Sequence, residues 1–283
     1  MLTNKNILSF DIEEYFQVSG LAKAVSRSSW DNFASRVEQN TAVVLNILEK
    51  HNIKATFFVL GWIAERHPEL IKIIADQGHE IACHGYDHKL VYDMTSEEFA
   101  SDIKKTKDLL ESITGRKIYG YRAPSFSVAG SDIEKFEILA KTGFIYDSSL
   151  FPMKHFRYGD AYSAPLAPFD IKKDEDILLK EFPMSVVGLL GKRIPAGGGG
   201  YFRLYPNFLI RRNFRKIQSE GRPMIIYLHP WEFDPDQPRI SKAGYGNTFR
   251  HYFNLNKTQA KLEFILKEFR FGTFIDYLGV QTD

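Results

Sequence analysis

Short apolar runs alternate with amphipathic helical segments along most of this chain, and the alternation limits the folds open to it. Residues 6–10, 54–60 and 80–83 are predicted to be short buried strands. Between them, residues 29–51 and 68–78 carry apolar side chains at helical intervals. Buried strands that are joined by helices form parallel sheets with helices packed against them. We therefore predict an α/β fold.

The second half of the chain is predicted to be less regular. Strands are expected at residues 177–183 and 223–228, whereas residues 148–176 are rich in proline, aromatic and charged residues without a period. Such a segment fits a long excursion within one domain better than a linker to another. The chain has 283 residues, of which 44% are hydrophobic, so it can bury one large core. We predict a single domain over residues 1–283, with a C-terminal extension of about 230–283 packed on it.

Three carboxylates follow the first predicted strand. In Asp11-Ile12-Glu13, alternation along an extended chain sends Asp11 and Glu13 to one side and Ile12 to the other. Glu14 then points away. An acidic turn in solvent is the alternative, but the alternation would let a base and a metal ligand share one pocket.

Two histidines follow the strand at residues 80–83. His84 and His88 are four residues apart, a spacing from which one helical turn aims both rings at one point. Unrelated surface histidines are the alternative. The zincin pattern does not fit, because Gly85 and Tyr86 stand where that motif has a glutamate. A metal bound here needs a third ligand, and a carboxylate at the end of another strand is the natural source.

The overall charge and the cysteine count exclude some classes of function. A net charge of +2 is too small to favour a nucleic-acid partner. No apolar stretch is long enough for membrane insertion, and no signal peptide is evident near Met1. Cys83 is the single cysteine, which excludes an internal disulfide framework. We expect a cytoplasmic protein of undetermined oligomeric state.

Six chemically competent side chains each fall just after a predicted buried strand. The carboxyl ends of parallel strands share one face, so these side chains are expected to meet there. They are Asp11, Glu13, His84, His88, Arg122 and His229.

These residues also carry a family resemblance. Ser9-Phe10-Asp11 with Glu13, His84-Gly-Tyr-Asp-His88, Arg122-Ala-Pro124 and Leu228-His229 resemble the successive motifs of the polysaccharide deacetylases, the NodB-homology proteins of carbohydrate esterase family four. The phrases at residues 55–61 and 229–235, with Arg239, are similar to a bacterial subgroup associated with exopolysaccharide loci.

The resemblance implies a distorted (β/α) barrel of about seven strands, a divalent metal such as zinc, and hydrolysis of an N-acetyl group from a sugar. It implies that Asp11 is the general base, that Arg122 orients Asp11, and that His229 is the general acid. The metal ligands implied are Glu13, His84 and His88. A backbone N–H near Ser125 would help to hold the oxyanion.

The chain departs from the family pattern at several positions. The usual adjacent Asp-Asp is here Asp11-Ile12-Glu13, which leaves Glu14 as a competing ligand. Ser125 stands where many members have tyrosine, and Trp231 is the candidate to replace the tryptophan that lines the acetyl pocket. Four glycines, residues 197–200, precede Tyr201. That segment is interpreted either as a flexible or closely packed loop or as a rim where the backbone meets a flat ligand such as a sugar.

The predicted function is removal of N-acetyl groups from an amino sugar in a surface polysaccharide or exopolysaccharide, or in its precursor. One rival is an allantoinase-like amidohydrolase that acts on a small amide. The other is a non-catalytic carbohydrate-binding descendant. The presence of both Asp11 and His229 favours an enzyme, because a binding module needs neither a base nor an acid.

Overall fold

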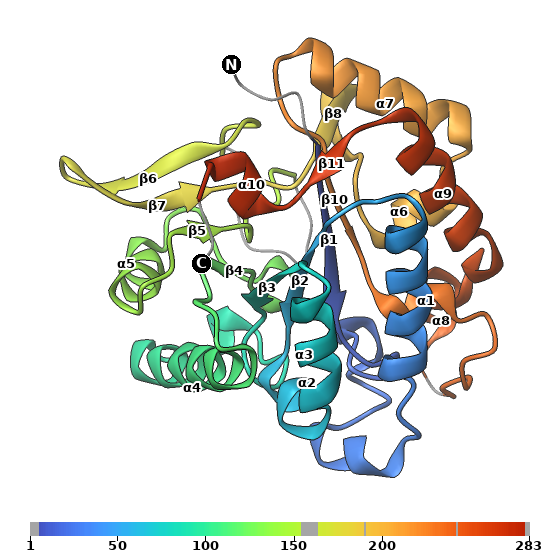
Figure 1. Cartoon of the computed structure of the whole chain (residues 1–283), viewed down its shortest axis with the longest axis horizontal. Coiled ribbons are helices and arrows are strands. Elements are labelled where there is room, and N and C mark those ends of the chain that lie inside the picture. The colour runs from blue at the N-terminus through green and yellow to red at the C-terminus, as the bar shows by residue number, and fades with distance from the viewer. Residues whose placement is uncertain (1–5, 154–163, 190, 242, 281–283) are drawn as a thin grey trace.

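A mostly parallel sheet organises the chain, as the alternation of strands and helices predicts (Figure 1). The computed structural model describes residues 6–153, 164–189, 191–241 and 243–280. Among these residues, seven parallel strands lie in the order β10-β1-β2-β3-β4-β5-β7, β6 pairs antiparallel with β7, and β11 pairs with β1. The strands of this sheet are β1 (Asn6–Ile12), β2 (Thr56–Val59), β3 (Glu80–Cys83), β4 (Gly120–Tyr121), β5 (Tyr146–Asp147), β6 (Phe169–Lys173), β7 (Asp176–Glu181), β10 (Ile225–Leu228) and β11 (Phe271–Gly272).

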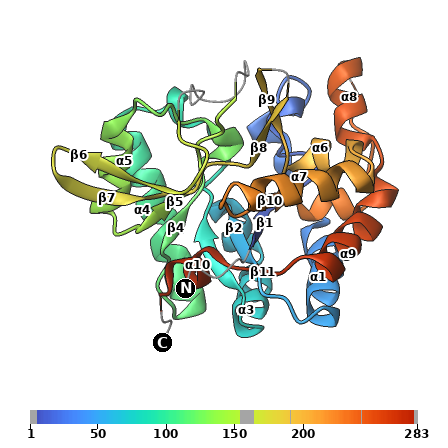
Figure 2. The ribbon, with the colours of Figure 1, turned by 90° about the horizontal axis from the view of Figure 1, so that it is seen from above.

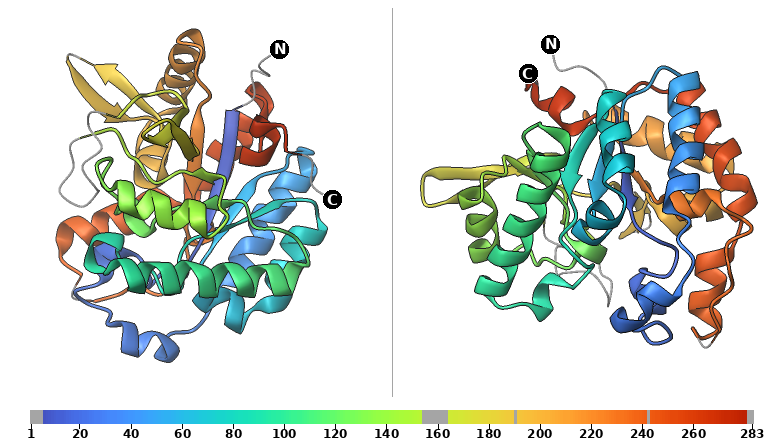
Figure 3. Two further views of the ribbon diagram at one scale, coloured as in Figure 1. Left: turned by 90° about the vertical axis from the view of Figure 1, so that its left-hand side faces the viewer. Right: turned by 60° about the horizontal axis from the view of Figure 1, so that its bottom comes forward.

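Helices cover the outer side of the sheet. The first five lie in the connections between β1 and β5, and α1 lies beside α9, where Lys50 Nζ is 3.6 Å from a Glu263 carboxylate oxygen (Figure 3). None of the described helices combines the length and the apolar composition needed to cross a bilayer. The helices are α1 (Val37–Lys50), α2 (Gly61–Arg66), α3 (Pro68–Asp76), α4 (Ser96–Thr114), α5 (Ile133–Lys141), α6 (Gly199–Leu204), α7 (Asn207–Ser219), α8 (Tyr245–Tyr252), α9 (Thr258–Glu268) and α10 (Phe274–Leu278).

Residues of β1 alternate between two apolar clusters. Leu8 and Phe10 belong to the large cluster between the sheet and its helices. Ile7 belongs to a smaller cluster inside the curved sheet, which also contains Phe58 and Phe274. At the amino ends of the strands, where β3 begins with Glu80, the backbone N–H of Phe274 donates to the buried Glu80 carboxylate at 3.1 Å. Helix α10 therefore closes the interior at this end. The opposite end, where the parallel strands finish, is left to form a site.

The sheet curves into a barrel that its ladders do not close. Within the described residues no ladder joins β7 to β10. The intervening chain, which includes the hairpin of β8 (Val186–Leu189) and β9 (Lys192–Pro195), fills the gap, and Gly197 O accepts a hydrogen bond from the Tyr227 N–H at 2.9 Å. A Cβ at Gly197 would lie 2.1 Å from Ile225 O, so the close packing interpretation of this segment is correct at that glycine. The family-type distorted (β/α) barrel is confirmed, in an open form.

Three local features differ from the sequence-based expectation. Helix α6 begins at Gly199, within the segment interpreted as a loop or rim. The helix predicted from residue 29 begins at Val37, because residues 27–32 form a separate 3₁₀ turn. The predicted irregular segment 148–176 contains β6, which forms a hairpin with β7 that projects from the sheet (Figure 2). This strand has one buried side chain, Ile171, and the apolar–polar alternation of its five residues is too short to stand out from the charged segment around it. Residues 154–163 lie outside the described part.

Candidate active site

Two carboxylates at the end of β1 enter the same site, while the third serves a helix. Asp11 and Glu13 are both buried and both line one cavity. The Glu14 carboxylate instead accepts the backbone N–H groups of Arg36 at 3.0 Å and Val37 at 3.1 Å, together with the Ser35 hydroxyl. It thus caps the N-terminus of α1, where a negative charge is favourable. Burial nevertheless raises the pKa of Glu14, because these hydrogen bonds offset only part of its desolvation. Alternation along the strand placed all three correctly.

The two histidines converge on Glu13. Its Oε1 atom lies 3.1 Å from His84 Nε2 and 3.2 Å from His88 Nε2. The chain between the histidines is a loop and not a helical turn, because Gly85 and His88 have φ values of 73° and 61°. Left-handed residues cannot continue a right-handed helix. The loop brings the two rings together at a centroid separation of 5.7 Å.

The hydrogen bonds around His84 test whether these donors fit a metal. His84 Nδ1 lies 2.8 Å from the carbonyl oxygen of Arg122, which can only accept, so Nδ1 carries the proton. If Nε2 also carries a proton, it donates to the Glu13 carboxylate. In the neutral ring Nε2 presents a lone pair instead, and a bound cation would then be needed between it and the carboxylate. Two donors on one tetrahedral zinc lie roughly 3.3 Å apart, close to the spacing seen here. The set of Glu13, His84 and His88 therefore fits a divalent metal.

Charge in the site favours ionised Glu13. Burial alone would raise its pKa, but His88 and His229, with hydrogen bonds from His84 and His88, hold the pKa of Glu13 well below its usual range. The carboxylate is therefore available as an anionic ligand.

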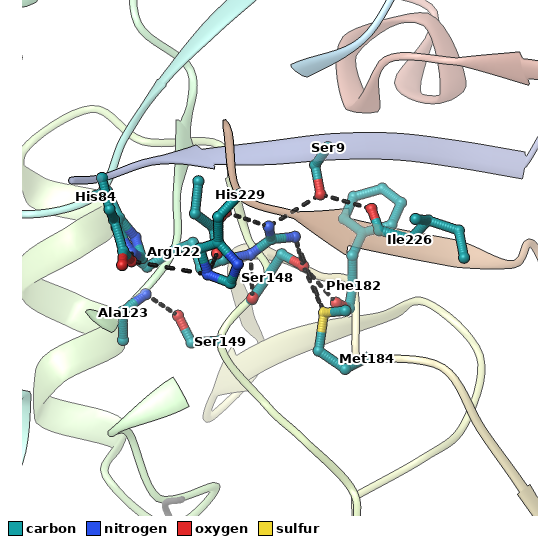
Figure 4. Close-up of polar contacts among 12 residues, drawn as sticks. Ser9, His84, Arg122, Ala123, Ser148, Ser149, Phe182, Met184, Ile226 and His229 are labelled. Atoms are coloured by element: carbon teal, nitrogen blue, oxygen red, sulfur yellow. Dashed lines mark hydrogen bonds and ion pairs between the residues drawn. The ribbon is translucent and has the colours of Figure 1, made fainter. Parts of the chain in front are cut away.

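Arg122 fixes the direction of Asp11. Its Nη1 donates to Asp11 Oδ1 at 2.7 Å and to Ser9 Oγ at 2.9 Å, while Nε and Nη2 donate to Ser148 at 3.2 and 3.1 Å (Figure 4). The guanidinium is fully buried, and its Cζ atom lies 4.0 Å from the centroid of the Phe58 ring. A buried arginine held by this many acceptors cannot turn away, so the second carboxylate oxygen of Asp11 is left facing the cavity.

His229 follows β10 and completes the group. Its Nε2 lies 3.9 Å from both Asp11 Oδ2 and Glu13 Oε1, while Nδ1 lies 2.8 Å from Glu232 Oε1. Burial would lower the pKa of His229, but the charges of Glu13, Glu232 and Asp11 outweigh it and raise the pKa to about 9. The Glu232 carboxylate also accepts the backbone N–H of His229 at 3.0 Å. It therefore sets the ring so that Nε2 faces the site.

Sequence reasoning assigned no role to Glu232 or to its partner Arg203. Arg203 Nε donates to Glu232 Oε2 at 2.6 Å, and both side chains are buried. The signal available for Glu232 is an acidic residue three positions after His229, which reaches back across the short turn Pro230–Phe233. Nothing in the sequence indicates Arg203.

A cavity of about 370 Å³ opens on these groups. The predicted substrate residues Ser125, Trp231 and Tyr201 all line it, whereas His84 and Arg122 do not. The 3₁₀ turn Ser19–Leu21 and helix α8 complete its wall.

Ser125 and Trp231 each have a conformation that bears on their predicted roles. Ser125 has φ 51° and its hydroxyl is 2.7 Å from the hydroxyl of Ser19. Within the described residues its backbone N–H donates to no protein acceptor, so it is available to a ligand. Trp231 stacks between His229 and His251, with ring centroids 5.0 and 4.3 Å away.

The α/β barrel brings possible metal ligands, a carboxylate paired with arginine and a histidine to the carboxyl ends of its strands. This combination of fold and site is typical of a hydrolase. Family comparison is more specific. Residues 23–144 match the family model described as polysaccharide deacetylase, and residues 148–279 match a domain of unknown function (DUF3473). Residues 23–144 thus form a polysaccharide deacetylase domain of the NodB-homology type, followed by the DUF3473 region.

Curated relatives agree with this assignment. The chain is 36% identical to a peptidoglycan deacetylase of Helicobacter pylori over 124 residues, which are 42% of this chain and 41% of the relative. It is 40% identical to a peptidoglycan-N-acetylglucosamine deacetylase of Bacillus cereus over 75 residues, 26% of this chain and 27% of the relative. The chain thus spans less than half the length of these curated relatives.

Among solved structures, a protein of Mycobacterium smegmatis assigned to the polysaccharide deacetylases has a TM-score of 0.62 and 20% identity, over 96% of this chain and 89% of its own. The Puue allantoinase has a TM-score of 0.60 and 16% identity, over 96% of this chain and 87% of its own. At these identities the structures establish the shared fold.

Both matched ranges contribute residues to the site. His84, His88 and Arg122 lie in the first range, whereas His229 and Glu232 lie in the second. Both ranges also supply strands to one sheet.

Proposed function

We propose that this protein is a metal-dependent hydrolase that removes N-acetyl groups from an amino sugar of a polysaccharide or its precursor. The observation that carries the proposal is that Glu13, which meets His84 and His88, lines one cavity together with Asp11 and His229. The relatives described as peptidoglycan deacetylases support a saccharide substrate. An exopolysaccharide is the form of substrate that the sequence motifs favour.

The roles of the side chains follow from their positions. A divalent metal, zinc by preference, bound by Glu13, His84 and His88 would supply Lewis acidity for the acetyl carbonyl and for water. Asp11, held by Arg122, takes the proton from the attacking water. His229, whose Nε2 faces the site, gives a proton to the departing sugar amine.

The cavity wall adds two further contributions. The free N–H of Ser125 is placed to donate to the oxygen that becomes negative during attack. Tyr201 and Trp231 present aromatic surface on which a sugar ring or an acetyl methyl group packs.

An assay for acetate release tests the proposal. The purified protein is incubated with a panel of N-acetylated glycans, with and without a chelator, and Asp11→Asn serves as the matched inactive control. We expect acetate from at least one glycan, loss of release with the chelator, and recovery when zinc is added.

The rival functions give different outcomes in the same assay. Turnover of allantoin or other small amides without acetate release from any glycan would favour an amidohydrolase, whose fold is equally similar. Binding of glycans without any turnover would favour a non-catalytic descendant. The cytoplasmic location and the single domain expected from the sequence stay predictions.

A further inference from the structure

Arg203 lies at a junction between His229 and the wall of the cavity. It belongs to α6, and its side chain is 1% exposed. While Nε donates to Glu232, Nη1 donates to the carbonyl oxygens of His251 at 3.0 Å and Phe253 at 2.5 Å, and Nη2 donates to that of Arg250 at 2.9 Å. One guanidinium thus holds a carboxylate and three carbonyl groups at once.

Those carbonyl groups belong to the C-terminal end of α8. The last carbonyl groups of a helix have no partner within the helix and carry partial negative charge, so a buried cation is favourable there. Helix α8 and the residues just after it contribute Gly246, Phe249, Arg250 and Phe253 to the cavity. Arg203 therefore anchors a segment that a substrate would touch.

The other side of the junction leads to the proposed general acid. Glu232 is fully buried, and its two oxygens are divided between two partners. Oε2 accepts from Arg203, and Oε1 faces His229 Nδ1 at 2.8 Å. Without Arg203, Glu232 would be a buried carboxylate with one partner fewer, and it would be free to rotate toward other donors.

We propose that Arg203 is a positioning residue that acts through Glu232, so that the orientation of His229 is tied to the α8 segment of the cavity wall. The inference rests on the proposed function in one respect, since it assigns His229 the acid role. A lysine at position 203 would keep the charge but lose the planar fork, which is the feature that serves four acceptors.

A double-mutant cycle separates this role from a merely structural one. We expect Arg203→Lys to lower kcat for acetate release roughly 10- to 100-fold, as is typical for partners that orient a functional group, with metal content unchanged. If Arg203 acts through Glu232, the double variant with Glu232→Gln will be no slower than the slower single variant. Independent, multiplicative losses would overturn the proposal.

Arg222 provides the matched control. It is also a buried arginine, which donates to Glu220 at 3.0 Å and to the carbonyl oxygens of Leu166 and Val186 at 3.1 and 3.3 Å. It touches neither Glu232 nor α8 in these bonds. Arg222→Lys should therefore combine multiplicatively with Glu232→Gln.

A second readout does not depend on activity. In the ¹⁵N spectrum of metal-free protein with labelled histidine, His229 should be protonated at Nδ1 in the wild type. Arg203→Lys should shift that signal as Glu232→Gln does, whereas Arg222→Lys should not. An unchanged His229 signal in Arg203→Lys would overturn the proposal. If Arg203→Lys does not fold, Arg203→Gln, which retains an N–H donor for Glu232, takes its place.

The two readouts keep this inference apart from the proposed function. If no glycan releases acetate but the His229 signal responds as expected, the positioning role stands and the deacetylase proposal fails. If acetate is released and the signal does not respond, the reverse holds.

Discussion

At the scale of single residues, the account depends on two carboxylates that lie two positions apart and have different partners. Asp11 is held by the Arg122 guanidinium at 2.7 Å, whereas Glu13 is faced by two imidazoles at 3.1 and 3.2 Å. A guanidinium fixes and orients a carboxylate, while neutral imidazoles combine with a carboxylate to hold a cation. The same side-chain type thus serves two proposed roles because its neighbours differ.

Substitutions at these two positions should separate the roles. We expect Asp11→Asn to keep its metal and to lose activity by about 10²–10⁴-fold, the contribution of a positioned general base. Glu13→Ala should lose both metal and activity. Elemental analysis together with acetate-release kinetics decides between them. If Asp11→Asn empties the site while Glu13→Ala does not, the two assignments are exchanged.

A buried histidine far from the site should govern part of the pH dependence of stability. His79 Nδ1 accepts the Ala55 N–H at 3.2 Å, and burial, with a smaller effect of the Lys54 charge, lowers its pKa to about 4. The folded protein therefore keeps this imidazole neutral. The contribution of His79 to the free energy of unfolding is fully present above the unfolded pKa, near 6.5, and is lost as the pH falls through 4. The loss amounts to about 3 kcal/mol in the free energy of unfolding.

The His79→Asn variant isolates this effect, because asparagine offers an acceptor near the Nδ1 position and does not titrate. Denaturant unfolding between pH 4 and pH 7 should show a shallower decline in the variant than in the wild type. Equal pH slopes in the two proteins would mean that His79 has the same pKa in the folded and the unfolded protein, and would contradict this account.

At the scale of elements, the start of α1 shows how tertiary contacts set a helix boundary. The helical pattern of the sequence extends back to residue 29, yet α1 begins at Val37, where the Glu14 carboxylate supplies the cap. A cap that comes from a residue 22 positions away from Arg36 leaves no local signal. The same holds for His88, whose φ of 61° no spacing rule anticipates.

Removal of that cap should cost stability without affecting the metal. We expect Glu14→Ala to lower the free energy of unfolding by about 1–2 kcal/mol, because two backbone N–H groups of α1 lose their acceptor. Glu14→Gln, which keeps an acceptor oxygen, should cost less. Chemical denaturation and elemental analysis check both variants. Loss of metal in Glu14→Ala would show that Glu14 is a ligand and that the alternation argument is wrong.

At the scale of the whole molecule, the sequence predicts which residues meet at the carboxyl ends of the strands. It does not predict the contacts between segments that only packing brings together. His84, Arg122 and His229 follow β3, β4 and β10, and parallel strands bring such residues to one edge. The Arg203 to Glu232 pair could not be predicted, because it joins α6 to a turn across 29 positions through packing alone. Likewise the strand β6 is not predicted, because its five residues give only a short pattern and the strand is defined by its pairing with β7.

The metal content of the protein tests the central claim most directly. Elemental analysis of purified wild type, His84→Ala and His88→Ala should give about one divalent ion per chain in the wild type, since a catalytic site of three protein ligands holds a single metal. Each histidine variant should give much less, because two ligands rarely retain an ion. No metal in the wild type under metal-replete conditions, or the same content in all three proteins, would contradict the account.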